Sequence, residues 1–464
     1  MANQLVPGLP AQVLSLVQEG AIERSFHDGL VPQLGFRAEA LQEEWPANSG
    51  TEIFMTRPGL LAPVVRPITP GTDPTPSAIA FEQWTAVLAQ YCDTMDTSMP
   101  ASVVAAANIL MRNIHQQGIQ AGMSINRVAR NKLFQTYLSG QSVGTAAIAA
   151  IDTTIHVAAL NGFTDVLAAS GAKPVAVSPS APLSVRIGTG AGSVLRNVIG
   201  FVPDDVNNII GPGTLTLSAA VGSAFPIRTS VVSAFAPRVV RAAAGASVDA
   251  IGAGDTFTLQ AVINAVSHLR MASVQPHEDG FFHAHISPLA NAQLFADPVF
   301  QRLNQSLPEG VTYREGFLGT ISGVMFYMNN ESPSMNNSGL LIGTGLLAQH
   351  ATDIGAEVVN GAGVQIGRVL LTGKGALYEK YLDESGYVSE AGVMGKIAEF
   401  SVVNNGVSIA TDKIRLILQA PLDRLQQKVA TTWSITTSFS CPSDALAASG
   451  PERFKRAIVI EHAL

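Results

Sequence analysis

The sequence predicts an α+β fold built from more than one domain, and three stretches carry this prediction. A long helical pattern runs from Thr97 to Gly140, residues 151–254 resemble a series of short strands, and residues 429–441 show the cleanest period-two alternation in the chain. At 464 residues the chain is too long for one hydrophobic core. We therefore expect two or three domains.

The composition is poor in charge. Only 14% of the residues are charged, against about a quarter in ordinary globular domains, and the mean hydropathy is +0.26. A chain of this kind is expected to cover much of its outer surface with partner molecules. The net charge of −7 argues against a dedicated nucleic-acid-binding domain, although it still allows a local basic surface.

Targeting and redox signals are weak. The sequence has no apolar run of the roughly 18 to 20 residues that a membrane span needs, and its first residues lack the basic start of a signal peptide. We therefore expect a protein that is made and folded in the cytosol. Cys92 and Cys441 are the only cysteines, which excludes a disulfide scaffold and a cysteine-only zinc site.

The first 95 residues fall into two parts. Residues 1–50 hold a short amphipathic segment and then polar chain with scattered aromatic residues (Phe26, Phe36 and Trp45), which predicts an arm that docks on something else. Residues 51–95 begin with apolar pieces interrupted by prolines (Pro58, Pro63, Pro67, Pro70, Pro74 and Pro76). Proline cannot donate to a central ladder, so this part predicts edge strands, an extended hairpin turning near residues 70–73, or a disordered linker.

Residues 96–150 contain the longest helical signal. Thr97 and Ser98 are candidate caps, and Gly140 follows the last turn. One face is apolar at helical spacing: Val103, Ala107, Leu110, Ile114, Ala121, Ile125 and Val128. A helix of about forty residues would be about 60 Å long, and Gly118 and Gly122 would weaken or kink its middle.

The same region is asymmetric in charge. It has no acidic residue between Asp96 and Asp152, whereas four cations are present: Arg112, Arg127, Arg130 and Lys132. These cations predict a surface that faces DNA or an acidic neighbour. The alternative is an ordinary solvated helix face, because four cations over this span are a dilute charge.

Residues 151–254 predict a β-rich domain inserted between this helix and the remainder of the chain. The strand signals lie at 153–158, 173–177, 183–187, 214–218 and 231–235, with turn signals at Asn161-Gly162, Gly188–Gly192 and Gly211–Gly213. Asp255 is then expected to cap a helix whose apolar positions keep a 3.6-residue period: Leu259, Val262, Ile263, Val266 and Leu269.

Residues 255–464 continue with alternating helix and strand signals. A buried strand is predicted up to His285-Ile-Ser-Pro288, then two short helices, then a second strand paced by Gly316, Gly319 and Gly323. After a polar loop over 331–339, further strands are predicted at 340–347, 369–378, 397–403, 414–419 and 429–441. Residues 456–461 are expected to form a terminal partner strand.

Two patterns suggest catalysis or metal binding, each with an ordinary alternative. Gly140-Gln-Ser142-Val-Gly144 matches the nucleophile elbow, but that elbow needs a strand before the serine and a helix after it, and here the predicted order is reversed. His283 and His285 would point to one face of a strand, and with His277 and Glu278 nearby a metal site is one interpretation. Hydrogen-bonded core or interface histidines are the other, and no zinc signature matches.

Phosphate-binding motifs are incomplete. Gly188-Thr-Gly-Ala-Gly192 misses the dinucleotide fingerprint at its last spacing, and neither Gly373-Lys374 nor Gly395-Lys396 has the surroundings of a P-loop. We therefore assign no catalytic residue, no cofactor and no resident metal, and we expect a protein that is not an enzyme.

The stretch from Gly280 to Asn330 resembles the core of tailed-phage major capsid proteins. The resemblance lies in the strand that ends in His285-Ile-Ser-Pro288, the short helix after it, and the run Gly316-Phe-Leu-Gly-Thr-Ile-Ser-Gly-Val-Met-Phe-Tyr-Met-Asn-Asn330. It implies the fold that these proteins share with herpesvirus capsid proteins and encapsulins. The expected parts are an N-terminal arm (1–50), an extended loop (51–95), a spine helix region (96–150), the β-rich insertion (151–254), a peripheral or core domain (255–330), an axial domain (331–411) and C-terminal core strands (412–464).

The resemblance also sets expectations for stabilisation. Some capsid proteins of this fold are joined by an isopeptide bond from a lysine of the extended loop, but the first lysine here is Lys132. We therefore expect noncovalent stabilisation, through loop exchange, the inserted domain or a separate cement protein. No long charged coiled-coil segment precedes the arm at residues 1–50. Any scaffold is therefore expected to be a separate chain.

The function implied by the resemblance is structural. Copies of the chain would form hexamers and pentamers of an icosahedral head shell around double-stranded DNA, with non-specific DNA contacts, and with separate scaffold, portal and cement proteins as partners. The shell would be assembled in the host cytoplasm and become part of the virion. The alternatives are an encapsulin-like compartment that packages a protein, a phage tail or surface protein, and a hydrolase that uses Ser142.

Overall fold

The computed structural model describes residues 21–30, 35–46, 49–58, 64–65, 67, 71–73, 76, 81–98, 109–166, 174–206, 209–241, 248–305, 319–329, 363–382, 396–397, 400–403, 406–411, 413–419, 427–442 and 456–464. The chain divides into two compact units. The first unit comprises Met1–Ile53, Ala86–Arg130 and Leu377–Ser440, and the second unit comprises Phe54–Thr85, Asn131–Ala376 and Cys441–Leu464. Both contain helices and strands, so the α+β class predicted from the sequence is confirmed.

The first unit is built on one sheet, which has eight strands in the described part of the chain, in the order β1-β18-β23-β22-β21-β20-β19, with β4 also paired to β23. Its strands are β1 (Ala40–Glu44), β4 (Ala89–Ser98), β18 (Leu377–Tyr381), β19 (Lys396–Ile397), β20 (Phe400–Val403), β21 (Gly406–Thr411), β22 (Ile414–Gln419) and β23 (Lys428–Ser440). In β23, Val429, Thr431 and Trp433 are buried while their neighbours Ala430 and Thr432 are half-buried. The predicted alternation holds from Val429 to Trp433. Further along the strand it fails, because Ser434, Ser438 and Ser440 are also buried and Phe439 is half-buried.

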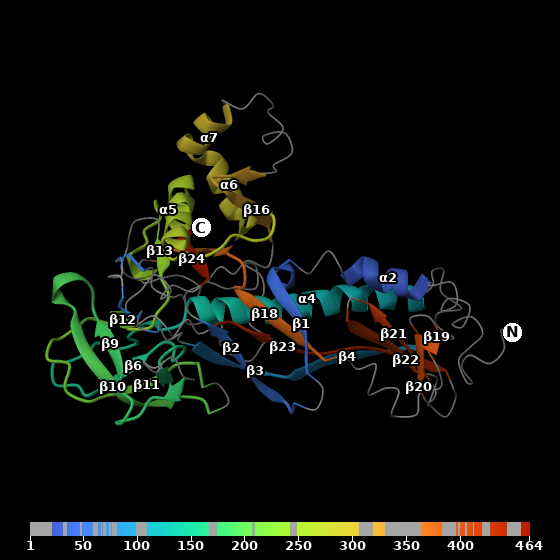
Figure 1. Cartoon of the computed structure of the whole chain (residues 1–464), viewed down its shortest axis with the longest axis horizontal. Helices are drawn as coiled ribbons and strands as arrows, with labels where there is room; N and C mark the ends of the chain where they lie inside the picture. Colours follow the sequence, from blue (N-terminus) through green and yellow to red (C-terminus); the bar gives the residue numbers. More distant parts are fainter. Residues whose placement is uncertain are drawn as a thin grey trace. The chain divides into compact units, whose positions relative to one another are not determined.

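A helix pair covers one face of this sheet. α4 (Ile109–Tyr137) is 29 residues long, or about 44 Å, and α2 (Ala21–Leu30) lies beside it (Figure 1). Apolar residues of both helices form one cluster with Trp433 and Ile435 of β23. The two helices come so close that a Cβ on Gly118 would lie 2.3 Å from the Phe26 carbonyl oxygen. Gly118 therefore permits close helix packing within an uninterrupted helix.

The predicted start of the long helix is wrong. Thr97 and Ser98 are the last residues of β4, where they pair with Val429 and Lys428 of β23, and they do not cap a helix. Residues 99–108 lie outside the described residues. Hydrophobic periodicity could not show whether Thr97 and Ser98 end a strand or cap a helix, because threonine and serine are common at both positions.

The aromatic residues of the predicted N-terminal arm are buried in the first unit. Phe26 packs against α4, the Phe36 N–H donates to Asn126 Oδ1 of α4 at 2.6 Å, and Trp45 is 4% exposed. For these residues, an arm that docks on something else is the wrong interpretation, because their apolar surface is already covered by their own chain. Residues 1–20 lie outside the described part.

Two strands of the proline-spaced segment pair with each other. β2 (Glu52–Pro58) and β3 (Phe81–Val87) form a two-stranded sheet, which we call the ribbon. The extended-loop range 51–95 differs from the structure at its end, because residues 89–95 belong to β4 of the eight-stranded sheet. β4 pairs along β23, and residues 89–95 within it are half-buried or exposed.

The β-rich segment folds as one sheet of the second unit, the inserted sheet. Within the described residues it has six strands in the order β5-β12-β9-β10-β11-β6. They are β5 (Gln141–Val143), β6 (Thr154–Val157), β9 (Leu183–Ile187), β10 (Val194–Pro203), β11 (Gly213–Leu217) and β12 (Ser230–Ser233), and β7 (Asp165–Val166) pairs with β8 (Val175–Ala176) beside it. The sheet starts before residue 151 and includes β10, which the sequence pattern did not predict.

The other large sheet of the second unit, the core sheet, carries the stretch from Gly280. Its order in the described chain is β13-β24-β17-β14-β16-β15. The strands are β13 (Val239–Arg241), β14 (Phe282–Ile286), β15 (Thr320–Ile321), β16 (Val324–Met328), β17 (Ile366–Thr372) and β24 (Ala457–Ala463). α5 (Leu259–Met271) packs on β24 and β13 (Figure 1), and α6 (Pro288–Ala296) and α7 (Pro298–Gln305) follow β14.

Two expectations for this region change. The cap of α5 is Thr258, whose hydroxyl accepts from the Ala261 N–H, whereas Asp255 accepts from the Gly252 N–H. β17 lies inside the core sheet and not in a separate axial domain. The predicted terminal strand is present as β24, and its partners are β13 and β17. The strand predicted at 340–347 and the loop at 331–339 lie outside the described residues.

No helix in the described part of the chain is both long enough and apolar enough to cross a membrane.

Candidate functional site

The four predicted basic residues do not share one face of α4. Arg112 is exposed, Arg127 and Lys132 are half-buried, and Arg130 is only 1% exposed. At about 100° per residue, Lys132 lies about 200° around the helix from Arg112. The burial of Arg130 argues against its facing DNA, and a DNA-facing role for the other three residues stays an untested prediction.

Ser142 is a buried strand residue. It lies in β5, paired with Val231 of β12, and is 3% exposed. Its hydroxyl oxygen accepts from the Ala159 N–H at 3.0 Å. A helix precedes it and a strand contains it, which is the reverse of the nucleophile elbow. The hydroxyl thus joins two segments of the inserted sheet.

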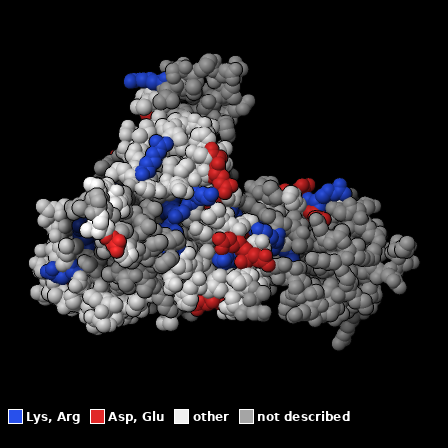
Figure 2. Space-filling view, viewed as in Figure 1, with Lys and Arg blue, Asp and Glu red and all other residues white. Residues whose placement is uncertain are grey.

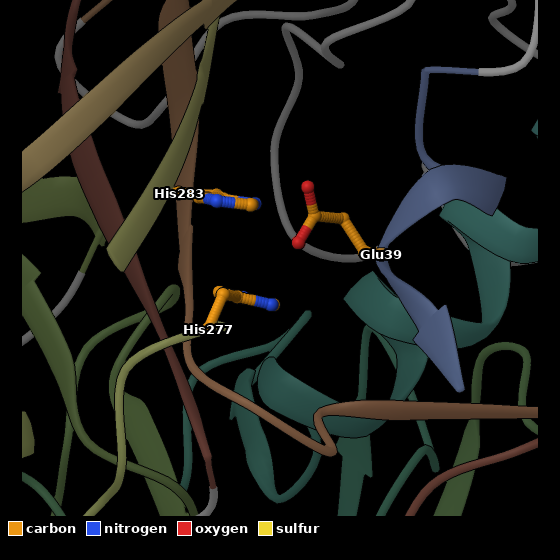
Figure 3. Close-up of side chains that lie close together, drawn as sticks. All are labelled: Glu39, His277 and His283. Atoms are coloured by element: carbon orange, nitrogen blue, oxygen red, sulfur yellow. The ribbon is translucent and has the colours of Figure 1, made fainter. Parts of the chain in front are cut away.

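His283 stacks on His277, which precedes β14, as well as sharing a strand face with His285. The rings of His277 and His283 stack, with centroids 3.9 Å apart and planes inclined by 6° (Figure 3). His283 and His285 both face the Tyr327 ring of the neighbouring strand β16, as expected for residues two apart on a strand. Periodicity could not place His277 with them, because it precedes the strand. Glu39, also drawn in Figure 3, belongs to the first unit.

Polar partners hold this histidine pair in place. His283 Nε2 is 2.8 Å from Asp279 Oδ2, and His277 Nε2 is 3.2 Å from Thr372 Oγ1 of β17. Partial burial opposes the charge of Asp279, but the Phe281 N–H and His283 outweigh it and lower the pKa of this carboxyl. Glu278 points to solvent and meets Lys374 at 3.3 Å, so it does not complete a metal site with the histidines.

The core sheet contains a buried ion triad that the sequence analysis missed. Glu461 of β24 stands opposite Arg241 of β13 on one side and Arg368 of β17 on the other. Its carboxylate accepts from Arg241 Nε at 2.9 Å and from Arg368 Nε at 3.1 Å. Burial opposes the charge, but the two guanidinium groups lower the pKa of Glu461. The only sequence signal was a charged residue inside an apolar run.

The first unit contains a second buried pair. Arg37 Nε lies 3.0 and 2.9 Å from the two carboxylate oxygens of Glu379 in β18, and Arg37 Nη2 lies 2.9 Å from Oε1. Gln42 and Thr437 donate to the same carboxylate. Both partners are at most 1% exposed. Because a half-broken buried pair is very costly, this contact fixes the chain before β1 on the sheet.

An exposed hydrogen-bonded chain crosses the edge of the inserted sheet. Thr145 Oγ1 lies 2.5 Å from His156 Nδ1, and His156 Nε2 lies 2.8 Å from Asp204 Oδ2. The threonine hydroxyl also donates to the His156 carbonyl oxygen at 3.3 Å. These contacts tie Thr145, β6 and the residue that follows β10 together.

The described surface is largely uncharged. On the face seen in Figure 2, the described residues are mostly uncharged, with scattered basic and acidic side chains among them. Several large apolar side chains are exposed on or beside the ribbon: Phe54, Val64, Val65 and Val87. Others are exposed on the second unit: Ile151, Leu195, Val202, Val206, Ile227, Met271 and Met328. A surface of this kind is typical of a subunit that is covered by partners.

Solved structures of phage capsids are similar in fold to this chain. The capsid of cyanophage P-SCSP1u shares 12% sequence identity over 91% of this chain and 86% of that chain, with a TM-score of 0.45. For the capsid of Ralstonia phage GP4 the identity is 11%, the coverage 91% and 87%, and the TM-score 0.46. For the capsid of cyanophage Pam1 the identity is 11%, the coverage is 90% of this chain and 86% of that chain, and the TM-score is 0.44. No protein-family model and no curated protein matches the sequence.

Proposed function

We propose that the chain is a major capsid protein, a structural subunit that assembles through hexamers and pentamers into the icosahedral head shell of a tailed virus. The observation that carries the proposal is the order of elements. A two-stranded ribbon, the long helix α4, an inserted sheet, and the unit β14-α6-α7-β16 follow one another along the chain. This is the order that the resemblance in the sequence implies.

The distribution of burial supports this role. A shell subunit must make nearly equivalent contacts in hexamers and pentamers, so it needs rigid centres and adaptable edges. The two buried ion networks lie within single units and fix their sheets. On the ribbon side, Val64 and Val65 are 82% and 84% exposed. Neighbouring subunits would cover these side chains and remove apolar surface from water.

The shell would enclose double-stranded DNA through non-specific contacts. Arg112 and Arg127 lie about 60° apart around α4 and share one side of the helix, whereas Lys132 faces another direction. They would screen phosphates without reading sequence, because nothing in their spacing matches base edges. Scaffold, portal and cement proteins would be separate chains, and the shell would form in the host cytoplasm before it becomes part of the virion.

Negative-stain electron microscopy of the purified chain, beside native particles from its source, tests the proposal. Closed shells of uniform size, with DNA in the native particles, are the expected result. Shells that hold a protein cargo would instead indicate an encapsulin-like compartment, and tubes would indicate a tail protein. A monodisperse monomer or small oligomer in both samples, across salt and protein concentrations, would refute a shell subunit.

A pair of variants tests whether the exposed valines between the two ribbon strands, Val64 and Val65, take part in assembly. We expect Val65→Asp to abolish shells while the circular dichroism spectrum and melting temperature stay unchanged, because the side chain is exposed in the free subunit. Ser218→Asp adds the same charge at an exposed polar position just after β11 and serves as the control. If both variants stopped assembly, the added charge and not the ribbon side would be responsible.

A further inference from the structure

A hollow of about 410 Å³ opens on one face of the inserted sheet. Its floor is a row of side chains across four strands. Gln141 of β5 stands opposite Val232 of β12, Val232 opposite Arg186 of β9, and Arg186 opposite Leu195 of β10. Directly opposite residues in neighbouring strands point to the same face, and all four line the hollow.

The row carries a positive charge near each end. Arg186 is exposed and makes no hydrogen bond or ion pair with another residue in the described part of the chain. Beyond Gln141, Arg241 lines the hollow with a side chain that is 9% exposed, and its Nη2 donates to Gln141 Oε1 at 2.8 Å. Arg241 and Arg368 share the single carboxylate of Glu461, so their triad has an excess of one positive charge.

Between the two charges the floor is apolar. Val232 lies between Gln141 and Arg186, and Leu195 lies beyond Arg186 with 61% of its surface exposed. No aspartate or glutamate is among the described residues that line the hollow. The charge and the apolar floor together define a surface complementary to an acidic segment that also carries an apolar residue.

We propose that this hollow binds an extended acidic segment of a partner protein. One carboxylate pairs with Arg186, a second approaches the Arg241 end, and an apolar side chain between them covers Val232. Neighbouring strands are about 4.8 Å apart, so Gln141 and Arg186 are separated by about 10 Å across the sheet. Residues i and i+4 of an extended segment lie about 13 Å apart on one side, a span that the long arginine side chains accommodate.

An acidic peptide fits this surface better than nucleic acid. Each DNA strand carries a phosphate about every 3.4 Å, whereas the hollow offers two cations separated by an apolar floor. A peptide with carboxylates at i and i+4 and valine at i+2 places charge and apolar surface where the row requires them. Such binding needs a folded subunit and is independent of shell formation.

Fluorescence anisotropy with a labelled peptide, Gly-Ser-Glu-Ser-Val-Ser-Glu-Ser-Gly, tests the proposal on the full chain at low ionic strength. We expect Arg186→Gln to weaken binding by about tenfold or more, since it removes a charge-assisted hydrogen-bond partner. Arg302→Gln removes the same charge from an exposed position on α7 outside the hollow and is expected to leave binding unchanged. The peptide with glutamine in place of both glutamates is expected to bind weakly to every variant.

A second variant keeps the test independent of Arg186. Val232→Asp places a carboxylate on the floor itself and is expected to reduce peptide binding as strongly as Arg186→Gln. Equal binding by the wild type and both hollow variants would overturn the proposal. The proposal would also be overturned if Arg186→Gln kept peptide binding but lost duplex DNA binding or self-association. The occupant would then be nucleic acid or a second copy of the chain.

Discussion

The two buried ion networks each pair charged side chains within a single unit, but they differ in the ratio of carboxylates to guanidinium groups. In the first unit one carboxylate, Glu379, meets one guanidinium, and two polar side chains complete its hydrogen bonds. In the second unit the single carboxylate of Glu461 serves two guanidinium groups across three neighbouring strands. The neutral pair fastens a turn to a strand. The triad leaves one excess positive charge, and Arg241 carries part of that charge to the wall of the hollow.

The largest expected effect comes from removing the shared carboxylate. Glu461→Gln removes the carboxylate that Arg241 and Arg368 share in the core sheet. Breaking a buried pair costs about 3–5 kcal/mol, and here two cations lose their partner, so we expect the free energy of unfolding to fall by at least that amount. Urea denaturation of the purified chain measures it. A loss below about 1 kcal/mol would mean that water reaches the triad.

The neutral pair allows a sharper test by a double-mutant cycle. Arg37→Met and Glu379→Leu are each expected to cost about 3–5 kcal/mol, because each removes one partner of a buried ion pair. The combination Arg37→Met with Glu379→Leu is expected to cost less than either single change, since two apolar side chains can fill the site. A double variant that costs the sum of the two single changes would show that the pair is not coupled.

The strand that carries the triad is also expected to respond to pH. Burial lowers the pKa of His462 to about 4, against the opposing effects of the Ala463 backbone and Glu461. The folded state therefore holds the neutral ring. As the pH falls from about 6.5 to about 4, the unfolded chain binds a proton that the folded chain does not, and stability drops by about 3 kcal/mol. Denaturation at several pH values, compared with His462→Gln, measures the difference, and parallel curves would contradict it.

The smallest expected effect concerns helix packing in the first unit. Gly118→Ala would place a Cβ at 2.3 Å from the Phe26 carbonyl oxygen, so α2 must move away from α4. Overpacking of this kind costs about 1–3 kcal/mol, although alanine in an open helix position would stabilise by about 1 kcal/mol. Hydrogen exchange of α2 amides reports the loosening. Unchanged or slower exchange would show that α2 does not depend on this contact.

The sequence predicted the elements with strong local periodicity. β23, α5 and the series β14-α6-α7-β16 each present their pattern within a few residues, so propensity and packing agree there. β10 was missed because only Val198 among its residues is buried, which leaves no alternation to detect. Arg112 and Arg130 show the limit of helical periodicity. They are five turns apart and face the same direction, yet one is exposed and the other is covered by packing that the sequence does not reveal.

The candidate sites were less predictable because their partners are far apart in the chain. Arg37 and Glu379 are separated by 342 positions, and no local pattern links them. The triad left a faint signal, since Arg368 and Glu461 interrupt strands in which every residue is buried. A charge inside such a strand requires an opposite charge nearby. The sequence therefore indicated that each buried charge needs an oppositely charged neighbour. Only the strand order of the core sheet identifies which residue that neighbour is.

The position of β24 between β13 and β17 also determines when the second unit can fold. β17 pairs with β14 on one side and with β24 on the other, and residues 373–456 must be synthesised before the second pairing can form. At roughly 5–20 residues per second this interval lasts on the order of ten seconds, during which an apolar strand edge is open. Nascent chains are thus vulnerable to edge-to-edge aggregation, and their yield should depend on chaperones that shield such edges.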